Sequence, residues 1–381
     1  MSVQVPVRPA MLRWALDRSG MRSDSKRFER FSRWADGHGA PTFRQLEEFA
    51  TATHAPLGYL FLEEPPVEEV PIPDFRTIGD TGVSQPSPDL LETIHAAQLR
   101  QEWYRGYSFD RGLEPLPFVG SVTSDSSVVE VAATIRDRLG FTVDRRRQFG
   151  DAEKALRQLI DAIEALGVLV MVSGIVGANT HRALDPKEFR GFALADPMAS
   201  LVFVNGADTK AAQIFTLVHE VAHLWLGESA LSDAAMAEAT QNDHERWANQ
   251  IAAEVLVPLQ SLRLEYAGTP SEQEVARLAK LYRVSTLVVL RRFFDAKFLG
   301  WSEYRTRYDA ELERIMAYLA TRKGSGGDYY NTQPLRISQL FARAVIVDAM
   351  EGRTLYRDAF SLLGAAKQST FEGMANKLGV A

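Results

Sequence analysis

The sequence of 381 residues contains no cysteine. Disulfide bonds and thiolate catalysis are therefore excluded, and any bound metal must be held by nitrogen and oxygen ligands. An excess of basic charge is also missing, because 43 lysines and arginines stand against 49 aspartates and glutamates, a formal net charge of −6. This balance argues against a protein whose whole surface binds nucleic acid, although it does not exclude local basic patches.

Long apolar runs are missing as well. No stretch reaches the roughly 18 uncharged apolar residues that a membrane span needs. The start of the chain lacks the apolar region and cleavage site of a secretory signal. We therefore expect a cytoplasmic protein without a membrane partner. The apolar fraction of 46% and the charged fraction of 24% are those of an ordinary globular chain.

Apolar spacing and punctuation by proline and glycine predict five segments. These are a helical domain over 1–66, a linker over 67–87, a domain with strands over 88–267, a helical subdomain over 268–323 and a helical tail over 324–381. Short runs rich in valine and phenylalanine predict strands at 168–173, 189–196 and 200–206. Loops are expected at 227–243 and at "KGSGGDYYNTQP", 323–334. The predicted fold class is α+β, mainly helical, with a small mixed sheet.

The stretch "FTLVHEVAHL", residues 215–224, carries the strongest chemical signal. Positions four apart lie on one helix face, so His219 and His223 can chelate one zinc ion. Glu220 lies about 100° around the helix, where it can act as general base on a water molecule. The alternative is a chance pair of histidines in the core, but buried neutral histidines need hydrogen-bond partners.

A catalytic zinc site uses three protein ligands. The next helix offers His244, Glu245 and Glu254, and Glu245 is the preferred candidate because it shares a helix face with Asn249. Asn249 could hydrogen-bond a histidine ligand and so fix its tautomer. The alternative for Glu245 is an acid favoured by the helix dipole in the first turn. His244 lies beside the expected helix start, and Glu254 is expected to face solvent or to make a supporting contact.

Two motifs together resemble the ImmA/IrrE-type zinc metallopeptidase family: "FTLVHEVAHL" and, after it, "ERWANQIAAEVLVP", residues 245–258. The upstream stretch "RGFALADPMASLVFVN", 190–205, resembles the strand pair of that family. The resemblance covers roughly residues 160–260. It implies a zincin-like peptidase domain with zinc ligands at His219, His223 and Glu245 and a general base at Glu220.

The flanking segments resemble a long subgroup in which a degenerate Xre-type helix-turn-helix precedes the peptidase domain. The resemblance implies a protease that cleaves or controls a repressor-like protein in a bacterial stress or mobile-element system, or an antitoxin partner of a PIN-type toxin. The alternative function is a non-catalytic antitoxin or DNA-binding regulator on a metallopeptidase scaffold. The sequence names neither the substrate nor the trigger.

DNA binding through the N-terminal basic helices is a further expectation, because the first 33 residues carry a basic excess that includes Arg27 and Arg30. The segment 23–42 is too short, however, for a second helix and a complete recognition helix. A second helix pair over 271–299 also resembles a helix-turn-helix, and its Arg291 and Arg292 could contact phosphates or an acidic partner. The alternative is a subdomain that braces the peptidase core.

A peptide substrate is expected to lie extended beside the strand at 200–206 and to add itself to the sheet edge. A further group should stabilise the oxyanion. His181 and Arg190 are the candidates, and the sequence does not select between them.

Overall fold

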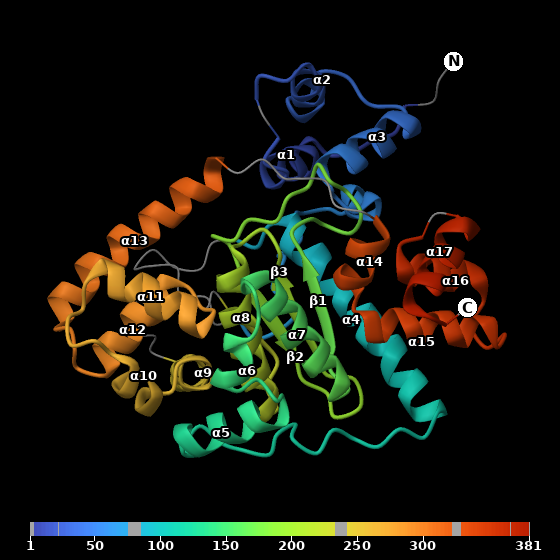
Figure 1. Cartoon of the computed structure of the whole chain (residues 1–381). Helices are drawn as coiled ribbons and strands as arrows, with labels where there is room; N and C mark the ends of the chain where they lie inside the picture. Colours follow the sequence, from blue (N-terminus) through green and yellow to red (C-terminus); the bar gives the residue numbers. More distant parts are fainter. Residues whose placement is uncertain are drawn as a thin grey trace. The chain divides into compact units, whose positions relative to one another are not determined.

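The structure is a computed structural model, and it describes residues 4–21, 23–74, 85–232, 242–321, 329–365 and 367–380. The chain divides into two compact units. The first unit comprises Met1–Pro71 and Gly82–Ile94, and the second comprises Ile72–Thr81 and His95–Ala381. The structure is mainly helical with one small mixed sheet (Figure 1), so the predicted α+β class is confirmed. No helix among the described residues is long and apolar enough to cross a bilayer.

The first unit is a small helical bundle with its own core. Its helices are α1 (Pro9–Arg18), α2 (Lys26–Ala35), α3 (Phe43–Thr53) and the 3-10 helix η1 (Leu57–Phe61). The Ser25 side chain caps α2, and Thr42 with Gln45 forms a capping box at α3. The segment 23–42 holds the single helix α2, as its short length predicts.

Helices make up most of the second unit. They are α4 (Pro88–Asp110), which starts in the first unit, α5 (Val128–Arg138), α6 (Val143–Arg147), α7 (Ala152–Ala165), α8 (Lys210–Leu226), α9 (Asp243–Leu256), α10 (Leu259–Glu265), α11 (Glu272–Tyr282), α12 (Thr286–Asp295), α13 (Trp301–Thr321), α14 (Tyr329–Ile337), α15 (Gln339–Met350), α16 (Tyr356–Leu363) and α17 (Gln368–Leu378). The strands are β1 (Leu169–Ser173), β2 (Gly191–Leu194), β3 (Leu201–Asn205) and β4 (Ala230–Ser232).

The sheet has the strand order β1-β3-β2-β4. β1 runs parallel to β3, and β2 runs antiparallel to both β3 and β4. The three predicted strands are confirmed as β1, β2 and β3, but β4 lies inside the predicted loop 227–243. A run of three residues is too short to show alternation, and β4 exists because it pairs with β2, which is distant in sequence.

The order of the strands overturns one expectation about the substrate. β3 lies between β1 and β2, so both of its edges are already paired. A peptide therefore cannot add itself beside residues 200–206, as was predicted. The outer strand on the β2 side of the sheet is β4.

Helices α7 and α8 cover one face of the sheet (Figure 1). Val170, Val202 and Val204 of the strands share their buried cluster with Ile214 and Val218 of α8. The strands are buried on both faces, which explains their nearly continuous apolar sequence. Helices α14 and α15 contact β1, the outer strand opposite β4.

The predicted loop over 323–334 is wrong in its second half. Residues 322–328 lie outside the described residues, but Tyr329–Ile337 forms α14 with Pro334 inside it. Tertiary contacts outweigh the local turn signal here. A Cβ added at Gly373 would lie 2.4 Å from the Tyr330 ring, and Gln333 Nε2 donates a hydrogen bond to the Leu363 carbonyl at 3.0 Å.

Candidate metal centre

Helix α8 presents the H-E-x-x-H residues from a buried position. The Thr209 side chain accepts a hydrogen bond from the Ala212 amide at its start, and Gly227 ends the helix with a φ of 75°. Every residue from Gln213 to Trp225 is buried. A helix that is apolar on nearly all sides must lie inside the domain, and its few polar side chains therefore lack access to water.

The two histidines of α8 point at a common place. His219 and His223 are both fully buried, and their Nε2 atoms lie 3.2 Å apart. Burial lowers the pKa of His223 below its ordinary value. The neutral imidazole is the form that binds a metal ion, so burial favours the ligand state of this residue.

Helix α9 supplies a carboxylate to the same place. The Asn242 side chain caps α9 by accepting from the amides of His244 and Glu245. Glu245 is 3% exposed, with Oε2 at 3.3 Å from His219 Nε2 and Oε1 at 3.1 Å from His223 Nε2. The ligand atoms of these three residues lie within 4.8 Å of one another.

The charge state of Glu245 follows from its neighbours. Burial by itself would raise its pKa, but the interactions with His219 and His223 outweigh that effect and hold the pKa below the ordinary value. The cluster thus offers two imidazole nitrogens and one ionised carboxylate. This is the ligand set of the two-histidine, one-glutamate zinc sites, and no sulfur ligand is needed.

Glu220 stands beside the cluster and is fully buried. Within the described part of the chain, neither of its carboxylate oxygens has a hydrogen-bond partner of normal geometry. Burial raises the pKa of Glu220 to about 8 and the nearby Glu245 adds to the increase, although interactions with His219 and Ser232 partly oppose it. A carboxyl group in such a position can exchange a proton near neutral pH.

Two features of the sheet support the cluster, and the sequence did not predict them. Ser232 of β4 donates a hydrogen bond from Oγ to Glu245 Oε1 at 3.1 Å. Gly191 of β2 approaches α8 so closely that an added Cβ would lie 2.8 Å from Glu220 Oε1 and 2.6 Å from Thr216 Cγ2. Any larger residue at position 191 would push against the proposed general base.

The other ligand candidates lie outside the cluster. His244 bonds through Nδ1 to Glu228 Oε2 at 2.7 Å. Glu254, expected to face solvent or support the site, is instead 8% exposed and forms an ion pair with Arg292. The Oδ1 atom of Asn249 is buried without a hydrogen-bond partner in the described part of the chain, so a bond to a histidine remains a prediction.

The candidates for the oxyanion role are placed as follows. His181 is exposed. Arg190 precedes β2, and its Nε lies 3.5 Å from Asp208 Oδ2. Among the described residues, neither side chain makes a hydrogen bond or an ion pair with His219, Glu220, His223 or Glu245. The oxyanion role therefore stays unassigned.

Arginines hold the far end of α9 in place. Three of them donate to the last carbonyl groups of this helix, which carry the negative end of its dipole. The bonds run from Arg136 to Glu254, from Arg146 to Val255 and from Arg292 to Val257, at 3.0, 3.4 and 2.8 Å. Burial of Arg292 also excludes the expectation that it contacts phosphates, and Arg291 forms an ion pair with Asp295 at 3.0 Å.

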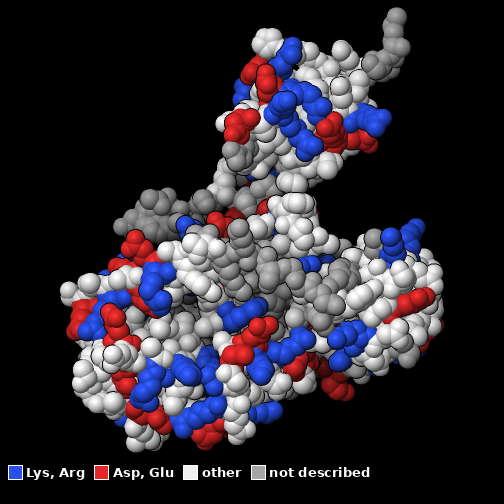
Figure 2. All heavy atoms as spheres, turned by 45° about the horizontal axis from the view of Figure 1, so that its top comes forward, with Lys and Arg blue, Asp and Glu red and all other residues white. Residues whose placement is uncertain are grey.

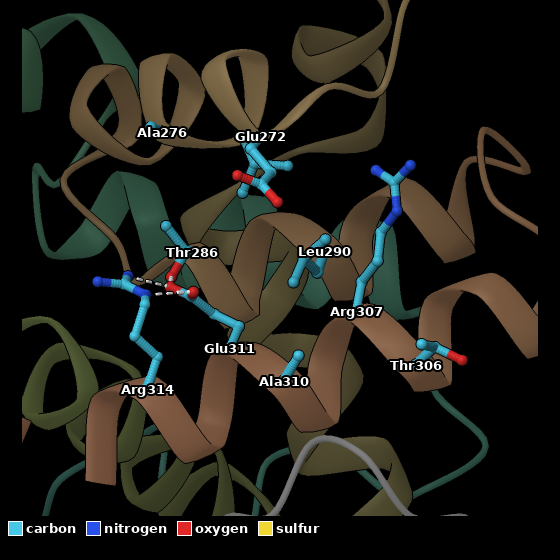
Figure 3. A pocket seen from close by; sticks show the side chains of 10 residues that line it. Glu272, Ala276, Thr286, Leu290, Thr306, Arg307, Ala310, Glu311 and Arg314 are labelled. Atoms are coloured by element: carbon cyan, nitrogen blue, oxygen red, sulfur yellow. Dashed lines mark hydrogen bonds and ion pairs between the residues drawn. The ribbon is translucent and has the colours of Figure 1, made fainter. Parts of the chain in front are cut away.

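A separate pocket lies between α11, α12 and α13 (Figure 3). It encloses about 440 Å³, and Leu290 and Ala310 form part of its apolar lining. Its polar group Glu311 already accepts hydrogen bonds from Thr286 and Arg314. None of the clustered residues of α8 and α9 lines this pocket.

Within the first unit, many basic side chains are paired. Arg18 makes two hydrogen bonds to Glu68, at 2.7 and 2.6 Å, and Arg30 pairs with Glu48 at 2.6 Å. Figure 2 shows acidic and basic side chains interspersed on this unit. Fewer charges are therefore left for phosphate groups than the sequence count suggests, and DNA binding stays a prediction.

Comparison with protein families gives two matches. Residues 163–294 match the peptidase family M78, described as the IrrE N-terminal-like domain. Residues 337–377 match a domain of unknown function, DUF8813. No curated protein matches the chain. The first match spans the three residues of the cluster and Glu220, and it supports a metallopeptidase-like domain of the ImmA/IrrE family in this part of the chain.

Proposed function

We propose that the second unit is a zinc-dependent endopeptidase. The observation that carries the proposal is the buried cluster of His219, His223 and Glu245, with the buried carboxyl group of Glu220 beside it. The donor set and its burial fit a zinc ion. When bound, the ion supplies Lewis acidity, which polarises the scissile carbonyl and lowers the pKa of water.

The residues of the chain would then divide the remaining work. Glu220 takes a proton from the attacking water and passes it to the leaving amine as the peptide bond breaks. Ser232 holds Glu245 in its orientation by a hydrogen bond. The buried walls of α8 exclude bulk water, so the charges within the site interact strongly.

The peptide itself would bind as an extended strand. Both edges of β3 and of β2 are already paired, so the edge near the cluster belongs to β4. Ser232, the last residue of β4, contacts Glu245 directly. A backbone paired with this edge would therefore be close to the metal ligands.

The biological role we propose is regulatory. By the family resemblance, the substrate is a repressor-like protein, and a PIN-type toxin is the alternative partner. Zinc is the cofactor in both proposals, which differ only in the protein that is bound. The variant described next distinguishes a protein that cleaves its partner from one that only binds it.

The variant Glu220→Gln tests the proposal. It keeps the three metal ligands and removes the proton acceptor, so we expect zinc binding to be retained and cleavage of an unfolded protein such as casein to fall by roughly 10²- to 10⁴-fold. The matched control is Glu164→Gln, a buried glutamate outside the cluster, which should keep its activity. Equal cleavage by wild type and Glu220→Gln would contradict the proposal.

A further inference from the structure

The outer edge of β4 is occupied by the chain itself. The Leu231 amide points away from β2 and donates to the Pro73 carbonyl at 2.9 Å. Asp74 pairs with Leu231 as a parallel bridge. The Pro73 carbonyl accepts this hydrogen bond, but Pro73 has no backbone N–H. It therefore cannot donate a hydrogen bond to a carbonyl group of β4 in return.

The segment that makes this contact belongs to a different compact unit from the residues that precede it in the sequence. Ile72–Asp74 group with the second unit, whereas the described residues before them, up to Pro71, group with the first. The Ile72 side chain is 9% exposed, so it anchors the segment by burial. Val67, earlier in the same linker, is 86% exposed and has no such role.

This occupied edge adjoins the candidate metal centre. Leu231 precedes Ser232, whose hydroxyl donates to Glu245. Ser232 in turn pairs with Gly191, where an added Cβ would lie 2.8 Å from Glu220 Oε1. The amide used by Pro73 is thus the kind of edge donor that an incoming extended peptide needs.

We propose that Ile72–Asp74, the edge segment, is an autoinhibitory strap. By occupying the outer edge of β4 it keeps a peptide backbone from pairing there, and a substrate gains access when the edge segment leaves. The inference rests on the proposed function, because it concerns access to the same site. The strap is tethered, so it competes at a high effective concentration and a peptide supplied from outside binds poorly.

Displacement of the edge segment provides the test. The full chain carrying Glu220→Gln is compared with the same chain carrying also Ile72→Asp, which puts a charge at the buried anchor. The probe is a fluorescein-labelled peptide copying residues 68–74, EEVPIPD. We expect its Kd, measured by fluorescence polarisation, to fall at least about tenfold on displacement. Val67→Asp, the matched control with the same charge at an exposed position, should leave the Kd unchanged.

Hydrogen exchange at the Leu231 amide supplies a second readout. We expect faster exchange in the Ile72→Asp chain and renewed protection when the peptide is added. Faster exchange without tighter peptide binding would overturn the proposal. Pro73→Gly, which loosens the segment and leaves Ile72 in place, is the second variant. If neither substitution changes exchange at Leu231, the edge segment does not hold the edge, and the proposal is equally overturned.

The test is independent of catalysis. In the wild-type background, Ile72→Asp should also raise the rate of casein cleavage. If the zinc-loaded chain cleaves nothing with or without this substitution, the proposed function fails. The binding and exchange results of the Glu220→Gln chains still decide whether the edge segment is a strap.

Discussion

Helix α9 carries a buried glutamate near each end, and the two are neutralised in different ways. Glu254, in the last turn, forms an ion pair with the guanidinium of Arg292, which also binds Asp295. Glu245, in the first turn, contacts the imidazoles of His219 and His223 and accepts a hydrogen bond from the Ser232 hydroxyl. One end therefore has the permanent positive charge of an arginine, and the other has two imidazoles and a hydroxyl group in its place.

The difference shows what a buried carboxylate requires. Removing a charge from water is costly unless a counter-charge and hydrogen bonds replace the solvent. At Glu254 the protein supplies both, so the site needs no ligand. At Glu245 the paired groups are imidazoles, which carry no permanent charge, and a second buried carboxyl group, that of Glu220, stands close by. A divalent cation would complete this end, as Arg292 completes the other.

The largest expected effect is at the last turn of α9, where Arg292 pairs with Glu254. Arg292→Met leaves Glu254 buried without its partner, and we expect the free energy of unfolding to fall by about 3–5 kcal/mol. Urea denaturation measures this. The double variant Arg292→Met with Glu254→Met should recover a large part of the loss, because no lone charge remains. A single variant as stable as wild type would break the comparison.

The next prediction concerns the response of each end to zinc. Zinc at 100 times its Kd should stabilise the wild type by about 2.7 kcal/mol relative to the same chain in chelator. Glu245→Gln should lose most of this increment. Glu254→Gln should lower the stability of the zinc-loaded chain and of the chain in chelator by a similar amount, so the increment due to zinc should be kept. Thermal unfolding with zinc and with chelator distinguishes the two, and equal increments in both variants would contradict the assignment of Glu245.

A substitution at Gly191 of β2 tests how closely the sheet packs against Glu220, beside the metal ligands. Gly191→Ala places a Cβ 2.8 Å from Glu220 Oε1 and 2.9 Å from the Phe203 carbonyl oxygen. We expect a loss of about 1–3 kcal/mol, as for other overpacked sites. Gly106→Ala, in α4 with no atom within 4 Å of the added Cβ, should be neutral or stabilising. The same loss in both variants would mean that the close approach at Gly191 is unimportant.

The smallest effect is a pH dependence at Glu164 of α7. Its carboxylate accepts a hydrogen bond from Ser338, but burial raises its pKa above 4.5. The folded state therefore binds this proton more tightly than the unfolded state. The resulting stabilisation is complete below about pH 4.5 and is lost as the pH rises through the folded-state pKa.

Glu164→Gln cannot ionise, so its stability relative to wild type should increase between pH 4 and pH 7. The sign of this change follows from burial, which raises the pKa of Glu164 in the folded state. Urea denaturation of both chains across this pH range measures it. A constant difference between the chains would show that Glu164 does not titrate as its burial requires.

Local patterns in the sequence predicted much of the site. The spacing of His219 and His223 needs only a helix, and the apolar sequence of α8 predicts one. Glu245 could be chosen because its face of α9 differs from the face of Trp247 and Ile251, which are buried in the core. The structure brings His219, His223 and Glu245 together, as these inferences require, and each inference depends on residues within one or two helical turns.

The parts that the sequence did not predict depend on distant pairings. β4 with its Ser232 forms only because it pairs with β2, and the order of the strands makes β4, rather than β3, the outer strand. α14 forms across a predicted loop because Tyr330 and Gln333 contact the C-terminal helices. No pattern within a short window of sequence reports such contacts.

The zinc content of the purified chain tests the central claim most directly. After dialysis against zinc and removal of the excess, elemental analysis should find one zinc ion per wild-type chain and per Glu220→Gln chain. His223→Ala, which removes one of the three ligands, should hold essentially none. A wild-type chain without zinc, or a His223→Ala chain that binds zinc as tightly as wild type, would contradict the account.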